Sequence, residues 1–190
     1  MAKEVFWCSS CLNMSTRPRI TFDQEGRCNA CQWSDEKKTF NWKEREEELK
    51  KNLKKYTNAS DNYKVIVPVS GGKDGSYIAH KLKSDYGVEP LCVTVRPPLE
   101  TKIGQENVYN FVSSGFSHVH VSPDEEAMAA LNKYGFIEKG FPYYGWLICI
   151  HTAVLQIAKR FNIGLIFYAE DGEIEYLSLI HISEPTRPLE

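Results

Sequence analysis

The stretch from Val65 to Tyr77 constrains the fold of this chain more than any other. Its first part, VIVPVS, is a short apolar run rich in β-branched residues, which is typical of a buried strand. Gly71 and Gly72 follow at once, and the residues after them fit a helix that ends at Gly87. A strand, a glycine turn and a helix in this order predict the start of a βαβ unit.

The same alternation continues toward the C-terminus. Further strands are expected at residues 90–97, 118–122 and 163–170, and further helices at 104–115, after Pro123 and at 146–161. The helix at 146–161 is apolar nearly all round, so we expect it to be buried. Strands that alternate with helices of this length predict an α/β fold with a parallel sheet.

Composition divides the chain into four parts. Residues 1–40 are rich in cysteine and show no helical period, and residues 41–62 hold a charged helix at 43–56 followed by a polar linker. The alternating pattern occupies residues 63–176. Residues 177–190 contain LSLIHISEPTRP, which resembles the translation of an adapter oligonucleotide used in transposase-based sequencing libraries. We therefore expect a non-native tail on a domain that is truncated at its C-terminus and poorly active, with a genuine tail as the alternative.

The overall composition excludes several classes of protein. With 42% hydrophobic residues and a net charge of −2, the chain is neither a disordered segment nor a polyanion binder, so nucleic acid is an unexpected partner. No apolar run approaches the roughly 20 residues that span a bilayer, and the N-terminus MAKEVFWCSS lacks the features of a signal peptide. We expect a cytoplasmic protein without membrane association.

Four of the six cysteines are spaced as metal ligands. Cys8 and Cys11 form one C-x-x-C pair, Cys28 and Cys31 form the second, and 16 residues separate the two pairs. Each pair can bind one ion with two thiolates, and the loop between them can bring the four sulfurs into a tetrahedron. The spacing predicts a structural Zn²⁺ site in a small knuckle module, with iron, a disulfide or a redox role as alternatives.

The glycine turn has the features of an anion-binding loop. It matches neither the Walker A pattern nor G-x-G-x-x-G. It nevertheless leads from a strand into a helix, where backbone amide groups bind anions, and a plain strand-to-helix connection is the alternative. Lys73 and Asp74 are the candidate catalytic residues, Asp74 as a helix cap or a Mg²⁺ ligand. The residues expected to bind a triphosphate are Ser70, Gly71, Gly72, Lys73, Asp74, Gly75 and Ser76.

This loop resembles the PP-loop of the ATP-pyrophosphatase superfamily, usually written SGGxDS. Gly75 stands where many relatives have serine, and Ser76 supplies the hydroxyl one position later. The resemblance implies a doubly wound parallel sheet of the adenine-nucleotide alpha-hydrolase type, here preceded by the zinc-knuckle module. It also implies that ATP, bound with Mg²⁺ through its β- and γ-phosphates, is cleaved between the α- and β-phosphates.

Residues 5–176 as a whole resemble the N-acetyl sugar amidotransferases of bacterial surface-polysaccharide biosynthesis. The resemblance rests on the cysteine pairs with GRCNAC, the loop SGGKDGSY, CVTVRPP after the second expected strand, and FYAEDGEIEY near the end. It implies that AMP is transferred to the acetamido oxygen of an N-acetylated sugar and that ammonia then displaces AMP. It also implies a separate glutaminase subunit that supplies the ammonia.

A tRNA thiolase is the main alternative, because such an enzyme also joins zinc knuckles to a PP-loop. It would need a basic RNA-binding surface and a cysteine pair for sulfur handling. The net charge is slightly negative, and Cys92 and Cys149 lie apart in apolar segments where a role in the core is simpler. A non-enzymatic adaptor that only senses ATP is a further alternative.

Several other residues have open roles. An adenine would be bound around Val93–Arg96, at the end of the second expected strand. The loop at 140–146 suits stacking on a sugar as well as covering a sheet edge, and His80 and His151 are expected on helices without a catalytic role. The acidic residues after the fourth expected strand could bind Mg²⁺ or the sugar, or be solvated: Glu170, Asp171 and Glu173.

Overall fold

The computed structural model describes residues 4–57 and 63–170 of the chain. The chain divides into two compact units, the first holding the described residues up to Glu46 together with Glu170, and the second running from Glu47 to Ala169. The boundary between them falls inside a helix, Trp42–Thr57 (α2). The four-part division expected from composition stays a prediction. In the described part of the chain, no helix combines the length and the apolar character that crossing a membrane requires.

The first unit consists of short loops and one short helix. Two isolated antiparallel bridges, Trp7 with Met14 and Phe22 with Cys28, connect its loops. A helix, Asn29–Glu36 (α1), begins directly after Cys28 and includes Cys31, and a 3-10 turn, Lys37–Thr39, follows it. The sequence showed no helical period here, and α1 indeed buries none of its residues. Helix α1 starts directly at the cysteine pair, so the sulfur cluster rather than an apolar stripe fixes its position.

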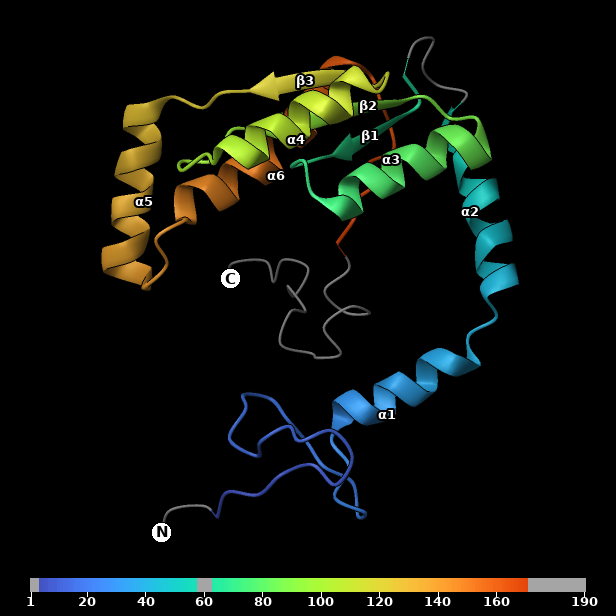
Figure 1. Ribbon diagram of the computed structural model, residues 1–190, viewed down its shortest axis with the longest axis vertical. Coiled ribbons are helices and arrows are strands. Elements are labelled where there is room, and N and C mark those ends of the chain that lie inside the picture. Colours follow the sequence, from blue (N-terminus) through green and yellow to red (C-terminus); the bar gives the residue numbers. More distant parts are fainter. Residues whose placement is uncertain (1–3, 58–62, 171–190) are drawn as a thin grey trace, which may run out of the picture. The chain divides into compact units, whose positions relative to one another are not determined.

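The second unit is built on a parallel sheet (Figure 1). Its strands pair in the order β1-β2-β3, with Val67 opposite Cys92 and Val93 opposite Val119. The fold class expected from the sequence is confirmed: strands alternate with helices along the chain. The elements are Val65–Pro68 (β1), Lys73–Tyr86 (α3), Pro90–Val95 (β2), Lys102–Ser113 (α4), Ser117–Val121 (β3), Glu125–Lys139 (α5) and Tyr144–Arg160 (α6).

A fourth extended segment makes β1 a central strand. Ile66 forms a parallel bridge with Ile166, its N–H donating to the Leu165 carbonyl at 2.9 Å and its carbonyl accepting from the Phe167 N–H at 2.8 Å. The strand expected at 163–170 is therefore present only as this short pairing. The chain moves outward from β1 to β3 and then returns to the opposite side of β1. Such a reversal makes the carboxyl end of β1 the topological switch point of the sheet.

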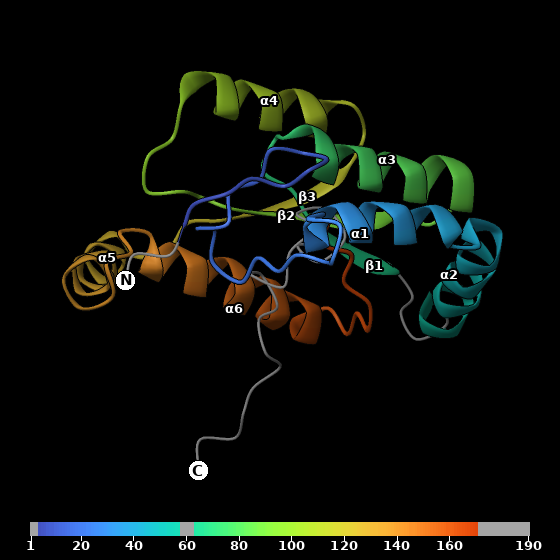
Figure 2. The same ribbon diagram turned by 90° about the horizontal axis from the view of Figure 1, so that it is seen from below.

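Helices cover both faces of this sheet, as Figure 2 shows for α3 and α4 on one face and α6 on the other. Alternate residues of β1 point to opposite faces, as the period of a strand requires. On one face Val65 and Val67 pack with Ala79 and Leu82 of α3 and with Phe111 of α4. On the other face Ile66, Leu91 and Val93 pack with Val154, Ile157 and Ala158 of α6.

Helix α6 is less buried than its sequence indicated. Gly145, Val154, Ile157 and Ala158 are buried, whereas Leu155 is 58% exposed. The expectation of a wholly buried helix is therefore wrong for the described residues. One stripe of α6 packs on the sheet and its first turn packs against α5, whereas other apolar side chains, among them Leu147 and Leu155, lie at the surface.

Candidate functional site

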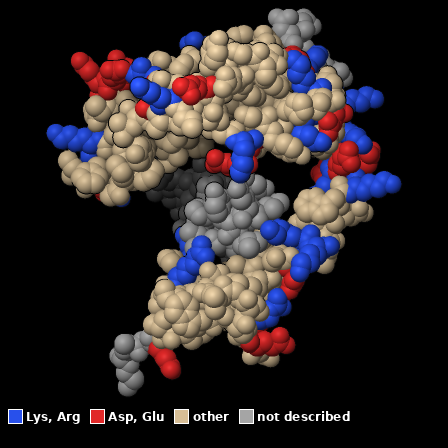
Figure 3. Space-filling model, viewed as in Figure 1, with Lys and Arg blue, Asp and Glu red and all other residues tan. Residues whose placement is uncertain are grey.

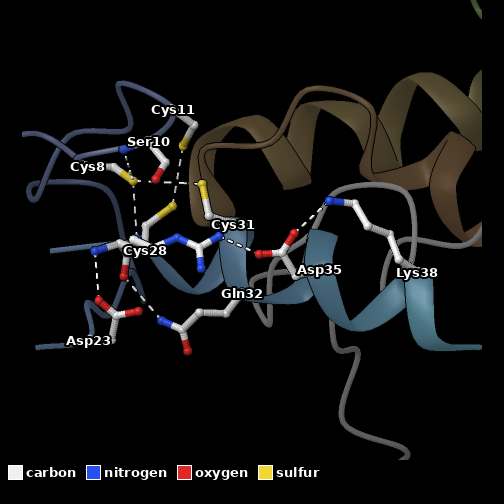
Figure 4. A network of polar contacts seen from close by, with 10 residues as sticks. Cys8, Ser10, Cys11, Asp23, Cys28, Cys31, Gln32, Asp35 and Lys38 are labelled. Atoms are coloured by element: carbon white, nitrogen blue, oxygen red, sulfur yellow. Dashed lines mark hydrogen bonds and ion pairs between the residues drawn. The ribbon is translucent and has the colours of Figure 1, made fainter. Parts of the chain in front are cut away.

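Four cysteine side chains of the first unit converge (Figure 4). The Sγ atoms of Cys8, Cys11, Cys28 and Cys31 all lie within 4.8 Å of one another. Two contacts link the C-x-x-C pairs, from Cys11 to Cys28 at 3.4 Å and from Cys8 to Cys31 at 3.8 Å. Four sulfurs at about 2.3 Å from one zinc ion stand about 3.8 Å apart. The predicted cluster of four cysteines is therefore present, and these two sulfur–sulfur distances lie near the separation that a single zinc ion requires.

The backbone around the cysteines takes the turns that this convergence requires. Leu12, directly after the first pair, and Gly26, just before the second, both have positive φ, at 61° and 75°. The Ser9 N–H donates to the Gly26 carbonyl at 3.0 Å, which connects the two turns. Cys28 is the N-cap of α1, so Cys31 lies in the first helical turn. Each cysteine pair is thus presented by a tight turn.

Hydrogen bonds to sulfur favour the thiolate form of Cys8. The N–H groups of Cys28 and Ser10 donate to Cys8 Sγ at 3.2 and 3.4 Å. Burial opposes ionisation of Cys8, but these amide groups outweigh it and lower the pKa of Cys8 to about 6. The adjoining thiols, Cys11 first among them, raise the pKa of Cys31 to about 12. Four thiols this close cannot all ionise without a cation to neutralise them, which is the chemistry of a metal site.

An acidic residue of α1 supports the second cysteine pair. Asp35 accepts from Lys38 at 2.7 Å and from Arg27 at 2.5 Å, and these two cations lower the pKa of Asp35 to about 2. Arg27 directly precedes Cys28. The ion pair therefore connects α1 to the segment that presents the cluster, although the exposure of these side chains limits its contribution to stability.

The glycine loop of the second unit connects β1 to α3 at the switch point of the sheet. Gly71 has φ of +79°, and a Cβ atom built there would lie 3.0 Å from Asn107 Cβ and 3.1 Å from the Val108 backbone nitrogen. Both the conformation and the close approach to α4 therefore require glycine at position 71. The sequence predicted this loop at the end of a buried strand, and the structure places it there.

The N-terminus of α3 has no side-chain cap. Gly72 is the N-cap and makes no side-chain cap hydrogen bond. By contrast, Thr101 accepts from the Gly104 N–H of α4 at 3.1 Å, and Asp124 accepts from the Ala127 N–H of α5 at 2.8 Å. The first N–H groups of a helix have no partner within the helix. At α3 these donors, with the positive end of the helix dipole, suit an anion.

The side chains of the loop have internal partners. Lys73 Nζ donates to both carboxylate oxygens of Asp74, at 2.7 and 2.9 Å, and both residues are exposed. Ser76 Oγ donates to the Gly72 carbonyl at 2.8 Å. At Gly75 a Cβ would lie 3.0 Å from the Pro68 carbonyl oxygen, so the close packing of α3 on β1 favours glycine at this position. The roles assigned to these residues from sequence stay predictions.

A pocket of about 550 Å³ opens beside the loop. Ser70 lies on its wall, together with Thr94 and Val95 at the end of β2, where the sequence predicted an adenine site. Arg96, expected in the same place, is not on the wall and instead forms an ion pair with Glu125. The rest of the wall is largely apolar and aromatic, and it comes from the loop after β2, from α4, from β3 and from Trp146 of α6.

The pocket also includes residues that sequence reasoning did not select. His118 and His120 of β3 both line it, as do Tyr109 and Trp146. The alternation HVHV was the available signal, because a strand places residues two apart on the same face. Burial and the nearby His120 lower the pKa of His118, so its imidazole is neutral near pH 7.

Of the remaining candidates, only the loop at 140–146 reaches this pocket within the described residues. His80 and His151 are exposed on helices, and neither lines the pocket. Glu170 is exposed, whereas Asp171 and Glu173 lie outside the described residues, as does the segment 177–188. The loop at 140–146 contributes Trp146 to the pocket wall, on the first turns of α6.

No protein-family model matches this chain, and no curated protein matches it either. Solved structures with partial similarity include one described as a predicted subunit of tRNA methyltransferase from Methanocaldococcus jannaschii, with 23% identity and a TM-score of 0.42, covering 63% of this chain and 58% of that one. An NMN synthetase from Francisella tularensis has 15% identity and a TM-score of 0.46, and the match covers 70% of this chain and 56% of the synthetase. The U34-tRNA thiolase from Methanococcus maripaludis with its 4Fe–4S cluster has 16% identity and a TM-score of 0.45, and the match covers 88% of this chain and 54% of the thiolase.

The chain thus spans between 54% and 58% of the length of these structures. At these identities and TM-scores the similarities assign neither a family nor an activity. The α/β fold of the second unit rests instead on the parallel register of its strands and on the helices that cover both faces of the sheet.

Proposed function

We propose that this protein is an ATP-dependent amidotransferase that adenylates the acetamido oxygen of an N-acetylated sugar. The observation that carries the proposal is the N-terminus of α3, which lacks a side-chain cap, follows a glycine loop and lies beside a pocket at the switch point of the sheet. An anion such as the β- and γ-phosphates of ATP suits the donors there. The adjoining apolar and aromatic wall at the end of β2 suits an adenine.

The chemistry follows from the poor reactivity of an amide. An amide oxygen is a poor leaving group, so ammonia does not displace it unaided. Attack of that oxygen on the α-phosphorus of ATP forms an O–P bond and releases pyrophosphate. Ammonia then attacks the imidate carbon, the C–O bond breaks with loss of AMP, and an acetamidino group remains. Mg²⁺ would neutralise charge on the phosphates, and the main tasks of the protein are positioning and electrostatic stabilisation.

Asp74 is the candidate Mg²⁺ ligand and Lys73 the candidate phosphate contact. In the free protein these two groups pair with each other, and both are exposed at the start of α3. An exposed pair of neighbouring charges is weak, so its separation by a bound phosphate and a metal ion costs little. The proposal assigns Zn²⁺ to the four cysteines as a structural ion, since four protein ligands leave no open position for catalysis. A separate glutaminase would supply ammonia.

Two observations favour this reaction over the tRNA thiolase alternative. Burial raises the pKa of Cys92 to about 12 and also raises the pKa of Cys149, so neither thiol is a nucleophile at neutral pH. The face drawn in Figure 3 carries lysine and arginine side chains interspersed with aspartate and glutamate. A surface that binds tRNA would instead gather positive charge.

The test measures the products of ATP cleavage. The protein is incubated with MgATP, ammonia and either an N-acetylated sugar nucleotide or tRNA. We expect AMP and pyrophosphate in equal amounts, dependent on the sugar, and a product that has gained an amidine. AMP formation that requires tRNA and ignores the sugar would support the thiolase instead. ADP as the product, or no cleavage of ATP, would contradict both.

A further inference from the structure

A chain of hydrogen bonds leads from β3 through β2 to the base of the glycine loop. Thr94 Oγ1 donates to the Val69 carbonyl at 2.7 Å, and His118 Nε2 lies 2.8 Å from the same hydroxyl oxygen. A hydroxyl has one proton, and a carbonyl can only accept. The Thr94 proton is therefore committed to Val69, so His118 Nε2 must carry a hydrogen and donate to Thr94. The contacts thus fix the order of donation as His118 to Thr94 to Val69.

This chain of hydrogen bonds lies in the interior of the second unit, where a polar group needs a hydrogen-bond partner. Thr94 is only 6% exposed and lies at the carboxyl end of the fully buried strand β2. A buried hydroxyl or carbonyl without a partner is unfavourable, and here each has one. The neutral form of His118 suits its role as a donor to Thr94 through Nε2 alone.

The hydrogen bonds hold both sides of Val69. The Val69 N–H donates to the Val93 carbonyl at 2.9 Å, and the Val69 carbonyl accepts from Thr94. The peptide unit between Val69 and Ser70 is planar and trans, so its C=O and N–H groups point in opposite directions. Fixing the Val69 carbonyl therefore fixes the direction of the Ser70 N–H, the first amide of the glycine loop. Ser70 also lies on the pocket wall.

We propose that Thr94 and His118 are positioning residues that orient the glycine loop for an anionic ligand. They act through the Val69 carbonyl, and neither contacts the phosphates. The inference rests on the proposed function in taking pyrophosphate as the ligand of the loop. The hydrogen-bond chain itself can be tested without that ligand.

The experiment compares variants of Thr94 and His118 that keep or remove the hydrogen-bonding group. Thr94→Val keeps the branched side chain and removes the link, whereas Thr94→Ser keeps the hydroxyl. His118→Leu removes the donor, and His118→Gln can return an N–H near the position of Nε2. Calorimetric titration of the 190-residue chain with inorganic pyrophosphate and Mg²⁺ gives the affinity. Amide hydrogen exchange at Val69, followed by NMR without ligand, reports on the base of the loop, and thermal melting shows that each variant is folded.

We expect Thr94→Val to weaken pyrophosphate binding about tenfold and to speed Val69 exchange by a similar factor, since it leaves the Val69 carbonyl unpaired. Thr94→Ser should stay within about twofold of the parent, and His118→Gln should bind more tightly than His118→Leu. A variant that is merely less stable would melt earlier but keep its affinity well below the melting temperature. Unchanged affinity and unchanged Val69 exchange in a folded Thr94→Val protein would overturn the proposal.

The two proposals can fail separately. If the unsubstituted protein binds no pyrophosphate, the proposed function is contradicted. Amide exchange at Val69 then still tests whether Thr94 and His118 fix the base of the glycine loop. If pyrophosphate binds equally to all four variants while Val69 exchange differs, the hydrogen bonds stabilise the fold but do not position the ligand. That result contradicts the inference and leaves the proposed function standing.

Discussion

At the scale of single residues, Gly71 combines two demands that a side chain cannot meet. Its φ of +79° disfavours any L-residue, and its hydrogens face α4 at a distance where a Cβ would crowd Asn107 and Val108. Gly87 at the end of α3 has φ of +63° but has open space around it. The two positions therefore separate conformational strain from steric overlap.

We expect Gly71→Ala to lower the free energy of unfolding by about 2–5 kcal/mol, from left-handed strain together with overpacking. Gly87→Ala, the matched control, should cost only the strain, about 1–2 kcal/mol. Denaturant unfolding of both variants measures the difference. Equal losses at the two positions would mean that α4 does not lie against the loop as described.

Asp74 is the residue on which the proposed chemistry depends most directly. Removing its charge by Asp74→Asn should reduce MgATP turnover by about 100-fold or more, because the metal loses a ligand beside the phosphates. Asp85→Asn lies on the same helix and also loses an ion pair, with Lys81, but at the opposite end. Turnover is measured as AMP release, and the zinc content should match the parent in both variants. Full activity in Asp74→Asn would remove this carboxylate from the site.

At the scale of elements, helices α5 and α6 approach each other closely through glycine. A Cβ at Gly135 would lie 2.1 Å from Tyr144 Cβ and 2.7 Å from the Phe141 carbonyl oxygen. Replacing a glycine inside a helix by alanine ordinarily stabilises the helix by about 1 kcal/mol. Here the sign should reverse, and Gly135→Ala should destabilise the protein by about 1–3 kcal/mol because α6 must move. The exposed Lys133→Ala on α5 should change the unfolding midpoint little, and a stabilised Gly135→Ala protein would contradict the packing of the two helices.

The elements also show what the sequence can and cannot reveal. The strand, glycine turn and helix at 65–86 were predictable because apolar period, turn residues and helix ends all agree there. Helix α1 was missed because the sulfur cluster, and not an apolar stripe, fixes its position. Helix α6 was expected to be buried because composition cannot tell which apolar side chains find partners. The link between Thr94 and His118 depends on strand pairing across 24 residues, which no local pattern encodes.

At the scale of the whole molecule, the two units are stabilised by different means. Within the described part of the first unit, the buried side chains are those of Cys8 and Cys28, both of them candidate metal ligands. The second unit has apolar clusters on both faces of its sheet. A small unit without an apolar core depends on a metal or another cross-link for its stability.

We therefore expect about one zinc ion per chain and two unfolding events, of which only one responds to metal. Removing zinc with a strong chelator should abolish the transition of the first unit and leave that of the second unchanged, as read by calorimetry. Cys31→Ser should have the same effect without a chelator, whereas Cys149→Ser, outside the cluster, should keep both the zinc and the transition. Iron in place of zinc, seen as visible absorbance of the purified protein, would keep the cluster as a metal site but contradict its assignment to zinc. A single transition that does not respond to the chelator would contradict the view that metal stabilises the first unit, because the described residues of that unit provide no apolar core as a substitute.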